Sequence, residues 1–164
     1  QESAAATLRY LKEMAESLHE QIAKDLAKPL EARAADYLAA VFGRGAVVDL
    51  DGLREGGQIT LVRGADRCPF EKLSGGTKEQ VGIALRLAMA EVLAGLPESG
   101  EGLPVVLDDA FANSDPDRLR GIQPMLSLAA RHGLQIILLT CSARDYASLA
   151  AHTVTLPPPV RAAV

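Results

Sequence analysis

Hydrophobic residues in the first part of the chain recur at steps of three or four, the spacing of one face of an α-helix. The series is Leu11, Met14, Leu18, Ile22, Leu26, Leu30, Ala34, Leu38, Val41 and Phe42, and it stops at Gly43. We predict one long helix over about residues 3–42, in which Pro29 can kink or interrupt the helix. The steps are not regular heptads, so two interpretations stay open. The helix either packs on its own domain or is the end of a coiled coil that enters a globular head.

The hydrophobic pattern becomes extended beyond this helix. Residues 46–50 and 58–62 are short β-prone runs, and the segment between them contains Asp51-Gly52 and Gly56-Gly57. Two such runs on either side of glycine-containing turn sequences predict a β-hairpin. We predict a loop over residues 63–73.

A second helix is predicted from about Gly75 to Ala94. Its apolar side is expected to consist of Val81, Leu85, Ala88, Met89 and Val92. After a loop, residues 103–107 form an uninterrupted apolar run that ends in two aspartates. A buried parallel strand has this pattern, with its polar residues at the carboxyl end.

The last part of the chain continues this alternation of helices and strands. Asp115 and Pro116 are favourable residues for the N-cap and the first position of a helix. The predicted segments are a helix over 116–131, a strand over 134–139, a short helix over 144–151 and a strand over 153–156. This order predicts an α/β fold with mostly parallel strands flanked by helices.

Composition narrows the class of protein. The chain has 164 residues, 48% of them hydrophobic, which is enough for one domain with a hydrophobic core. The net charge of -4 excludes a polycation that coats nucleic acid, so DNA contact would need a local patch or other parts of the protein. Cys68 and Cys141 are isolated, which indicates neither a disulfide framework nor a zinc site and favours a reducing, cytoplasmic compartment.

Targeting signals are not evident in the sequence. No apolar run is long enough to span a bilayer, and we expect neither a secretory leader nor a membrane partner. The chain starts with Gln1, within a helical pattern. We therefore expect a fragment, a processed product or an engineered half of a longer protein.

The first candidate site is Ser74-Gly75-Gly76, where a predicted loop turns into a helix. The first amides of a helix are free donors, and the helix dipole favours an anion there. Two glycines let an oxygen-rich ligand approach the backbone closely. Ser74 can cap the helix or donate a hydrogen bond to a phosphate. Taken alone, the tripeptide also fits an ordinary N-cap followed by a glycine turn.

The second candidate site is Asp108-Asp109, at the carboxyl end of a predicted strand. This end of a parallel sheet is where ligands bind. One carboxylate can hold Mg2+, which prefers oxygen ligands, and a second can orient or deprotonate an attacking water. A pair of solvated loop acids is the alternative interpretation.

The order of these motifs resembles that of the ABC ATPase superfamily. Residues 73–80, with the sequence LSGGTKEQ, are similar to its signature motif, residues 105–109 to its Walker B strand, and residues 113–115 to its D-loop. The helix sequence over 83–88 resembles the structural-maintenance-of-chromosomes (SMC) branch and its SbcC, RecN and YhaN relatives. The resemblance extends over about residues 70–156.

The resemblance implies nucleotide-binding roles for the Ser74 region. Ser74, Gly75 and Gly76 would contact the γ-phosphate of an ATP bound to an opposing head. Lys78, in the same motif, would belong to the nucleotide-binding residues or face the partner head.

The resemblance also implies roles for the residues that follow the strand. Asp108 would serve Mg2+, and Asp109 stands where most members of the family carry the catalytic glutamate. Asn113, Ser114 and Asp115 would form the D-loop, which crosses the dimer interface.

Three departures from the family pattern affect these roles. The chain contains no G-x-x-x-x-G-K-[ST] sequence, so the P-loop that holds ATP would lie on an N-terminal lobe, in the same gene or on a separate chain. Asp109 is one methylene shorter than glutamate, which would slow hydrolysis. Cys141 follows Thr140 where the family has the switch histidine, and a thiol is a poor substitute for imidazole.

The implied domains are a long helix over 1–42 as the end of a coiled-coil arm, a C-terminal ABC ATPase lobe over 43–156, and a proline-rich tail over 157–164. The implied function is ATP binding and hydrolysis between two heads in DNA repair or chromosome maintenance. Implied partners are the P-loop lobe, a second head, DNA and a nuclease or other repair protein, near the nucleoid. A non-hydrolysing ATP-sensing scaffold and a transporter subunit are the alternatives.

Weaker patterns carry no assignment of their own. The histidines His19, His132 and His152 lack metal-ligand spacing. Four arginines, Arg118, Arg120, Arg131 and Arg144, form either a basic surface or a solvated helix face.

Overall fold

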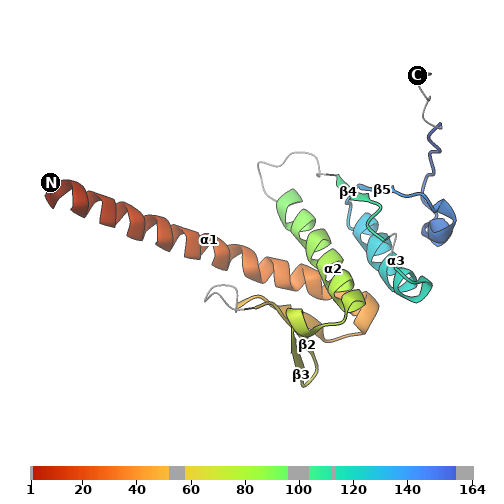
Figure 1. Cartoon of the computed structure of the whole chain (residues 1–164), viewed down its shortest axis with the longest axis horizontal. Helices are drawn as coiled ribbons and strands as arrows, with labels where there is room; N and C mark the ends of the chain where they lie inside the picture. Colours follow the sequence, from red (N-terminus) through yellow and green to blue (C-terminus); the bar gives the residue numbers. More distant parts are fainter. Residues whose placement is uncertain (1, 52–57, 96–103, 112–113, 158–164) are drawn as a thin grey trace, which may run out of the picture.

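The computed structural model covers the whole chain and describes residues 2–51, 58–95, 104–111 and 114–157 (Figure 1). Its first element, α1 (Glu2–Phe42), confirms the predicted long helix, which continues through Pro29 without interruption. The amino-terminal part of α1 extends away from the rest of the molecule, and its carboxyl-terminal part packs against the other helices (Figure 1). Ala34, Tyr37 and Leu38 are completely buried there.

A three-stranded antiparallel sheet follows α1. β1 (Ala46–Asp49) pairs with β2 (Thr60–Arg63), as predicted for the hairpin, and β2 also pairs with β3 (Asp66–Pro69). The predicted turn over 51–57 falls almost entirely outside the described residues.

The prediction of a loop over 63–73 was wrong, because this segment contains β3 and the short 3-10 helix η2 (Phe70–Lys72). The two-residue connection Gly64-Ala65 reverses the chain, and Gly64 has a φ of 61°, which glycine adopts readily. β3 is an edge strand in which Asp66 and Arg67 are exposed. It therefore lacks the apolar alternation that identifies a strand in sequence.

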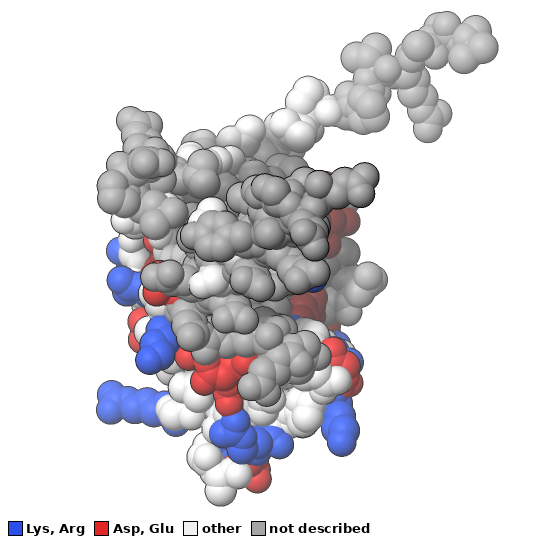
Figure 2. Space-filling view, turned by 90° about the vertical axis from the view of Figure 1, so that its left-hand side faces the viewer, with Lys and Arg blue, Asp and Glu red and all other residues white. Residues whose placement is uncertain are grey.

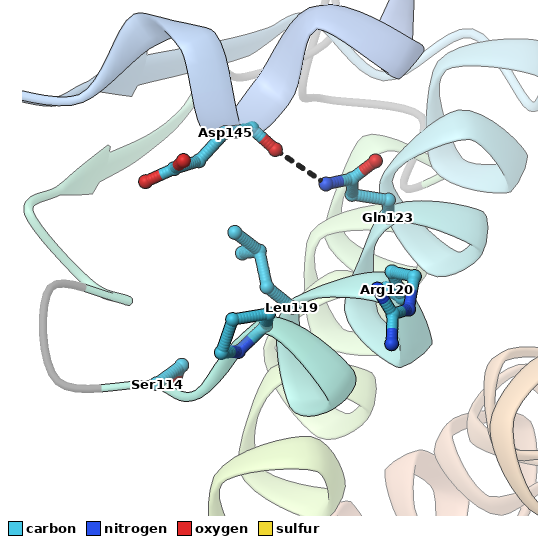
Figure 3. Close-up of a pocket in the computed structure, with 6 residues that line it drawn as sticks. Ser114, Leu119, Arg120, Gln123 and Asp145 are labelled. Carbon is cyan, nitrogen blue, oxygen red and sulfur yellow. Dashed lines mark hydrogen bonds between the residues drawn. The ribbon is translucent and has the colours of Figure 1, made fainter.

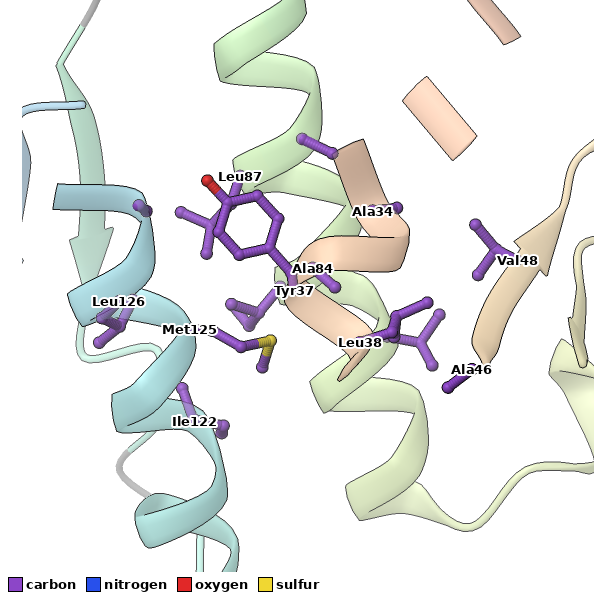
Figure 4. Packing of buried hydrophobic residues seen from close by; sticks show 14 of the residues in the cluster. Ala34, Tyr37, Leu38, Ala46, Val48, Ala84, Leu87, Ile122, Met125 and Leu126 are labelled. Atoms are coloured by element: carbon purple, nitrogen blue, oxygen red, sulfur yellow. The ribbon is translucent and has the colours of Figure 1, made fainter. Parts of the chain in front are cut away.

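Helix α2 (Gly75–Ala94) has the predicted bounds and lies between α1 and α3 (Pro116–Arg131) (Figure 1). Figure 4 shows α1, α2 and α3 contributing side chains to one core. Two helices cover α2, so residues on two of its sides are buried. For this reason Ile83, Ala84 and Leu87 are in the core although they lie outside the predicted apolar side, and Met89, predicted to be buried, is 37% exposed.

The second sheet consists of β4 (Val105–Asp108) and β5 (Ile136–Leu139), which are parallel as predicted. The expectation that both strands are fully buried was wrong. Val106 is 55% exposed, Ile137 39% and Leu139 43%, whereas Leu107 is buried. Side chains alternate between the two faces of a strand. One face of this sheet therefore packs on the core, and no layer of described residues covers the other.

The end of the chain differs from the prediction. The short helix near Arg144 is present as the 3-10 helix η3 (Ala143–Leu149). The strand predicted over 153–156 is not formed: this segment has no pairing partner among the described residues, and Val154 and Leu156 are 70% and 76% exposed. Within the part of the chain that is described, no helix is both long and apolar enough to cross a bilayer.

A carboxylate joins the three helices at the end of the core. Glu91 of α2 accepts a hydrogen bond from the Tyr37 hydroxyl of α1, lies 2.6 Å from His132 Nδ1 after α3, and lies 3.5 Å from Arg33 Nε. Burial, followed by the hydrogen bond to Glu91, raises the pKa of Tyr37 above its ordinary value of 10.0. Helix α1 is thus bonded to α2 through Glu91, and the same carboxylate contacts His132 at the end of α3.

This raised pKa predicts an alkaline loss of stability. The neutral Tyr37 phenol stabilises the fold fully below the unfolded-state pKa of about 10, and this contribution is lost as the pH rises further, because the unfolded chain releases the proton first. We expect Tyr37→Phe to make the free energy of unfolding less dependent on pH above pH 10. Urea unfolding at a series of pH values measures this, and parallel profiles for the two proteins would contradict it.

Candidate functional site

The first candidate site is the amino-terminal end of α2. Ser74 is its N-cap: the amide of Thr77 donates a hydrogen bond to Ser74 Oγ at 3.2 Å, and the two hydroxyls are 2.9 Å apart. Ser74 therefore caps the helix, as one of the two interpretations predicted. Its side chain is also exposed, so a ligand could reach it. A Cβ at Gly75 would meet no atom within 4 Å, so packing in this chain does not require glycine there. Lys78, in the first turn of α2, donates its amide to the Ser74 carbonyl at 2.9 Å.

Gly76 has different surroundings from Gly75. It is buried, and the side chain of Arg118 lies directly over its α carbon. The same arginine forms an ion pair with Asp115, with 3.0 Å between Nε and Oδ2. Sequence reasoning placed Arg118 only on a solvated or basic helix face and missed this contact.

The second candidate site lies at the carboxyl end of β4. Asp108 and Asp109 are both exposed, and the amide of Asp109 donates to the Leu139 carbonyl of β5 at 2.9 Å. Asp109 has a φ of 45°, in the left-handed region. Among residues with a side chain, aspartate and asparagine tolerate this region best, whereas others pay about 1–2 kcal/mol. This backbone gives a physical reason for aspartate at position 109.

The loop before α3 contacts the first turns of α2. Ser114 Oγ donates a hydrogen bond to Glu79 Oε2 at 2.8 Å. Asp115 is the N-cap of α3 and accepts from the Arg118 amide at 2.9 Å. This backbone hydrogen bond, together with the Arg118 charge, holds the pKa of Asp115 below its ordinary value. Asn113, the remaining predicted D-loop residue, lies outside the described residues.

Tyr146 is a further residue at this end of the molecule that sequence reasoning missed. Its ring packs at 6.4 Å from that of Phe111, the residue that follows β4 by three positions. Burial raises the pKa of Tyr146, a hydrogen bond with Thr140 lowers it, and the Asp109 and Glu79 carboxylates raise it. The ring contact with Phe111 links η3 to the segment that follows β4. The sequence around Tyr146 contains no motif that predicts this contact.

The other predicted candidates lie in and around this region without forming a second site. Cys141 is exposed, and the neighbouring Thr140 Oγ1 accepts a hydrogen bond from the Ser142 amide at 3.0 Å. Two of the four arginines of the possible basic surface are paired with carboxylates, Arg118 with Asp115 and Arg120 with Asp117. In the described part of the face shown in Figure 2, basic and acidic side chains both occur.

A shallow pocket of about 200 Å³ adjoins the loop before α3 (Figure 3). The pocket lies between the first turns of α3 and η3, where Gln123 Nε2 donates to the Asp145 carbonyl at 2.8 Å. Its lining is Ser114, Pro116, Leu119, Arg120, Gln123 and Asp145. It is a groove beside the candidate site.

Known proteins with similar sequences cover part of this chain. No family model matches it. Rv1278 of Mycobacterium tuberculosis is 40% identical over 89 residues, 54% of this chain and 10% of that protein. YhaN of Bacillus subtilis is 39% identical over 72 residues, 43% of this chain and 7% of that protein. The chain thus spans about a tenth or less of the length of these relatives.

Solved structures with similar folds cover most of the chain. The SMC head domain of Thermotoga maritima matches with a TM-score of 0.57 and 20% identity, over 79% of this chain and 44% of that one. A structure from work on ATP-driven dimerization and DNA-stimulated activation of SMC ATPases matches with a TM-score of 0.62 and 17% identity. The match covers 84% of this chain and 81% of that one. The Smc head of Pyrococcus furiosus bound to the C-terminal domain of ScpA matches with a TM-score of 0.57 and 16% identity. The match covers 88% of this chain and 35% of that one.

These matches define the class of fold. The chain is an α/β domain with the fold of SMC ATPase head domains. The resemblance predicted from residues 70–156 is confirmed at this level.

Proposed function

We propose that this chain is the C-terminal lobe of an SMC-like ATPase head, which acts on ATP held between two heads. One observation carries the proposal. The start of α2 and the loop before α3 are joined by the Ser114–Glu79 hydrogen bond and by the Arg118 side chain over Gly76. Two motifs that are separate in sequence, the start of α2 and the loop before α3, are thereby in direct contact.

The exposed face of the second sheet supports the need for another lobe. Val106, Ile137 and Leu139 present apolar side chains to solvent from two adjacent parallel strands. Parallel sheets normally have both faces covered. A lobe that carries the missing P-loop is the occupant we propose for this face, and it would hold most of the ATP.

Magnesium is part of the proposed site. Mg2+ typically takes one or two carboxylates and completes its six ligands with waters and phosphate oxygens. Asp108 and Asp109 supply that number of carboxylates. The residues therefore fit an ion that is bound mainly by ATP. Such an ion would neutralise charge on the phosphates.

The chain's own groups then have distinct tasks. The free amides at the start of α2 and the Ser74 hydroxyl are positioned to stabilise negative charge on a phosphate from an opposing head. Asp109 can accept a proton from an attacking water. Most of the catalytic effect would come from positioning and charge stabilisation, because phosphoryl transfer involves little covalent work by the protein.

Partners belong to this proposal as well. The SMC structures that resemble the chain include one studied for ATP-driven dimerization and DNA-stimulated activation. By analogy we propose a second head and DNA as partners, with the arm that includes α1 transmitting the motion of the heads. DNA contact would place the protein at the nucleoid, and a nuclease or other repair protein would act on the same DNA.

A second function, a nucleotide-sensing scaffold without turnover, is favoured by one observation. Cys141 is exposed at the position where the resembled ATPases carry histidine, and it cannot replace the imidazole. In this case the heads would associate on ATP and separate only when ATP dissociates.

The decisive experiment combines the chain with the P-loop lobe encoded by the same gene or its neighbour. We expect the two to form a complex that hydrolyses ATP. Val106→Asp should prevent complex formation, because it places a charge on the apolar face, while the chain itself still folds. Asp108→Ala should leave the complex intact and abolish hydrolysis.

The outcomes separate the two functions. ATP-dependent association of complete heads without turnover would favour the scaffold. Normal complex formation by Val106→Asp would contradict the proposed use of the sheet face. Binding is measured by size-exclusion chromatography and turnover by phosphate release.

A further inference from the structure

Gly76 is surrounded in a way that its neighbour Gly75 is not. A Cβ at position 76 would lie 2.2 Å from Arg118 Nε, 2.6 Å from Cδ and 2.7 Å from Cζ. Real Cβ atoms do not approach heavy atoms this closely, so the flexible end of the arginine side chain would have to shift away. At Gly75 the same atom would meet open space. Packing in this chain therefore favours glycine at position 76 but does not require it at position 75.

Arg118 is held in this position from its own helix. Its amide donates to Asp115 Oδ1 at 2.9 Å and its Nε lies 3.0 Å from Asp115 Oδ2. Asp115 belongs to the loop before α3, and Gly76 belongs to the first turn of α2. The guanidinium thus lies between the two segments that the proposed function brings to the phosphate.

The place of this charge is not explained by helix stability. Arg118 lies in the first turn of α3 and over the first turn of α2, and the amino-terminal ends of helices disfavour a cation. Asp115 compensates for part of this cost. The contact between Arg118 and Gly76 explains why this charge is kept in an electrostatically unfavourable place.

We propose that Arg118 is a positioning residue that fixes the loop before α3 against the first turn of α2, and that position 76 is glycine to make room for this side chain. The Ser114–Glu79 hydrogen bond provides a second link next to it. The catalytic consequence rests on the proposed ATPase function, whereas the contact itself does not.

The contact is tested by a double-mutant cycle on the full chain. We expect Gly76→Ala to lower Tm by about 2–4 °C, the shift that a loss of modest size produces in a chain of this length. In the Arg118→Ala background the same change should have little effect. Gly75→Ala is the matched control, and its effect should be equal in both backgrounds.

Each result of the cycle decides the question. A Tm loss from Gly76→Ala that disappears when Arg118 is alanine supports the proposal. Equal Tm losses from Gly76→Ala in both backgrounds, or failure of both to fold, would overturn it, because alanine would then be excluded by something other than Arg118.

The catalytic role is tested in the complete head with its P-loop lobe. Arg118→Ala should lower kcat several-fold and leave the KM for ATP unchanged, because the P-loop lobe holds the nucleotide. Arg118→Lys keeps the positive charge but lacks the planar guanidinium, so we expect it to restore kcat only in part. Unchanged kcat in Arg118→Ala would overturn the positioning role. If the unmodified head has no turnover, the proposed function fails, and the cycle on the chain still decides the contact.

Discussion

Ser74→Arg should abolish ATP-driven association of the heads. Ser74 is exposed at the N-cap of α2, and its φ and ψ of -61° and 154° are accessible to any residue. The larger side chain would fill the space in front of the free amides and remove the capping hydroxyl. We expect ATP turnover of the complete head to fall by about 10³-fold or more, since donors preorganised for a phosphate account for effects of this size.

The control for this variant places the same side chain elsewhere on the same helix. Met89→Arg adds an arginine at an exposed position near the other end of α2. Its association and turnover should be normal. Analytical ultracentrifugation with and without ATP measures association, and equal behaviour of the two variants would refute the role of the Ser74 region. A loss of the N-cap alone would lower stability in both the presence and the absence of ATP.

Local signals in the sequence identified the elements with strong periodicity or clear caps. α2 has the predicted bounds, α3 starts at the predicted Asp115–Pro116 pair, and β4 and β5 pair in the predicted direction. These features depend on neighbouring residues, which sequence reasoning can follow. β3 was missed because an edge strand needs no apolar face. The strand over 153–156 was predicted, although no segment that the structure describes pairs with it.

Long-range contacts explain what the sequence could not show at the site. The pattern of residues 73–80 indicated two glycines at a helix start, with a ligand as the common reason for both. The structure separates them, because Arg118, more than forty positions away in sequence, covers Gly76 and leaves Gly75 open. In the same way, Asp109 has a left-handed φ and donates its amide to β5, and neither feature could be predicted from the Asp-Asp pair.

The Asp109 backbone makes Asp109→Asn an informative substitution. Asparagine has the same shape as aspartate and tolerates the left-handed φ of 45°, so the fold should be unaffected. It lacks the negative charge and cannot accept the proton of an attacking water. We expect ATP hydrolysis to fall by about 10²–10⁴-fold, the usual contribution of a general base. ATP-driven association should persist, so the closed pair of heads accumulates.

Two comparisons distinguish this result from a general effect of charge or fold. Asp117→Asn neutralises another exposed aspartate, which pairs with Arg120 on α3, and should hydrolyse ATP normally. Asp109→Glu restores the residue of the resembled ATPases but places a longer side chain on a left-handed backbone, at a cost of about 1 kcal/mol in stability. Single-turnover hydrolysis and sedimentation measure the two steps separately. If Asp109→Asn turns over as fast as the unmodified head, Asp109 is not the base, and the backbone conformation at this position serves only the β4–β5 connection.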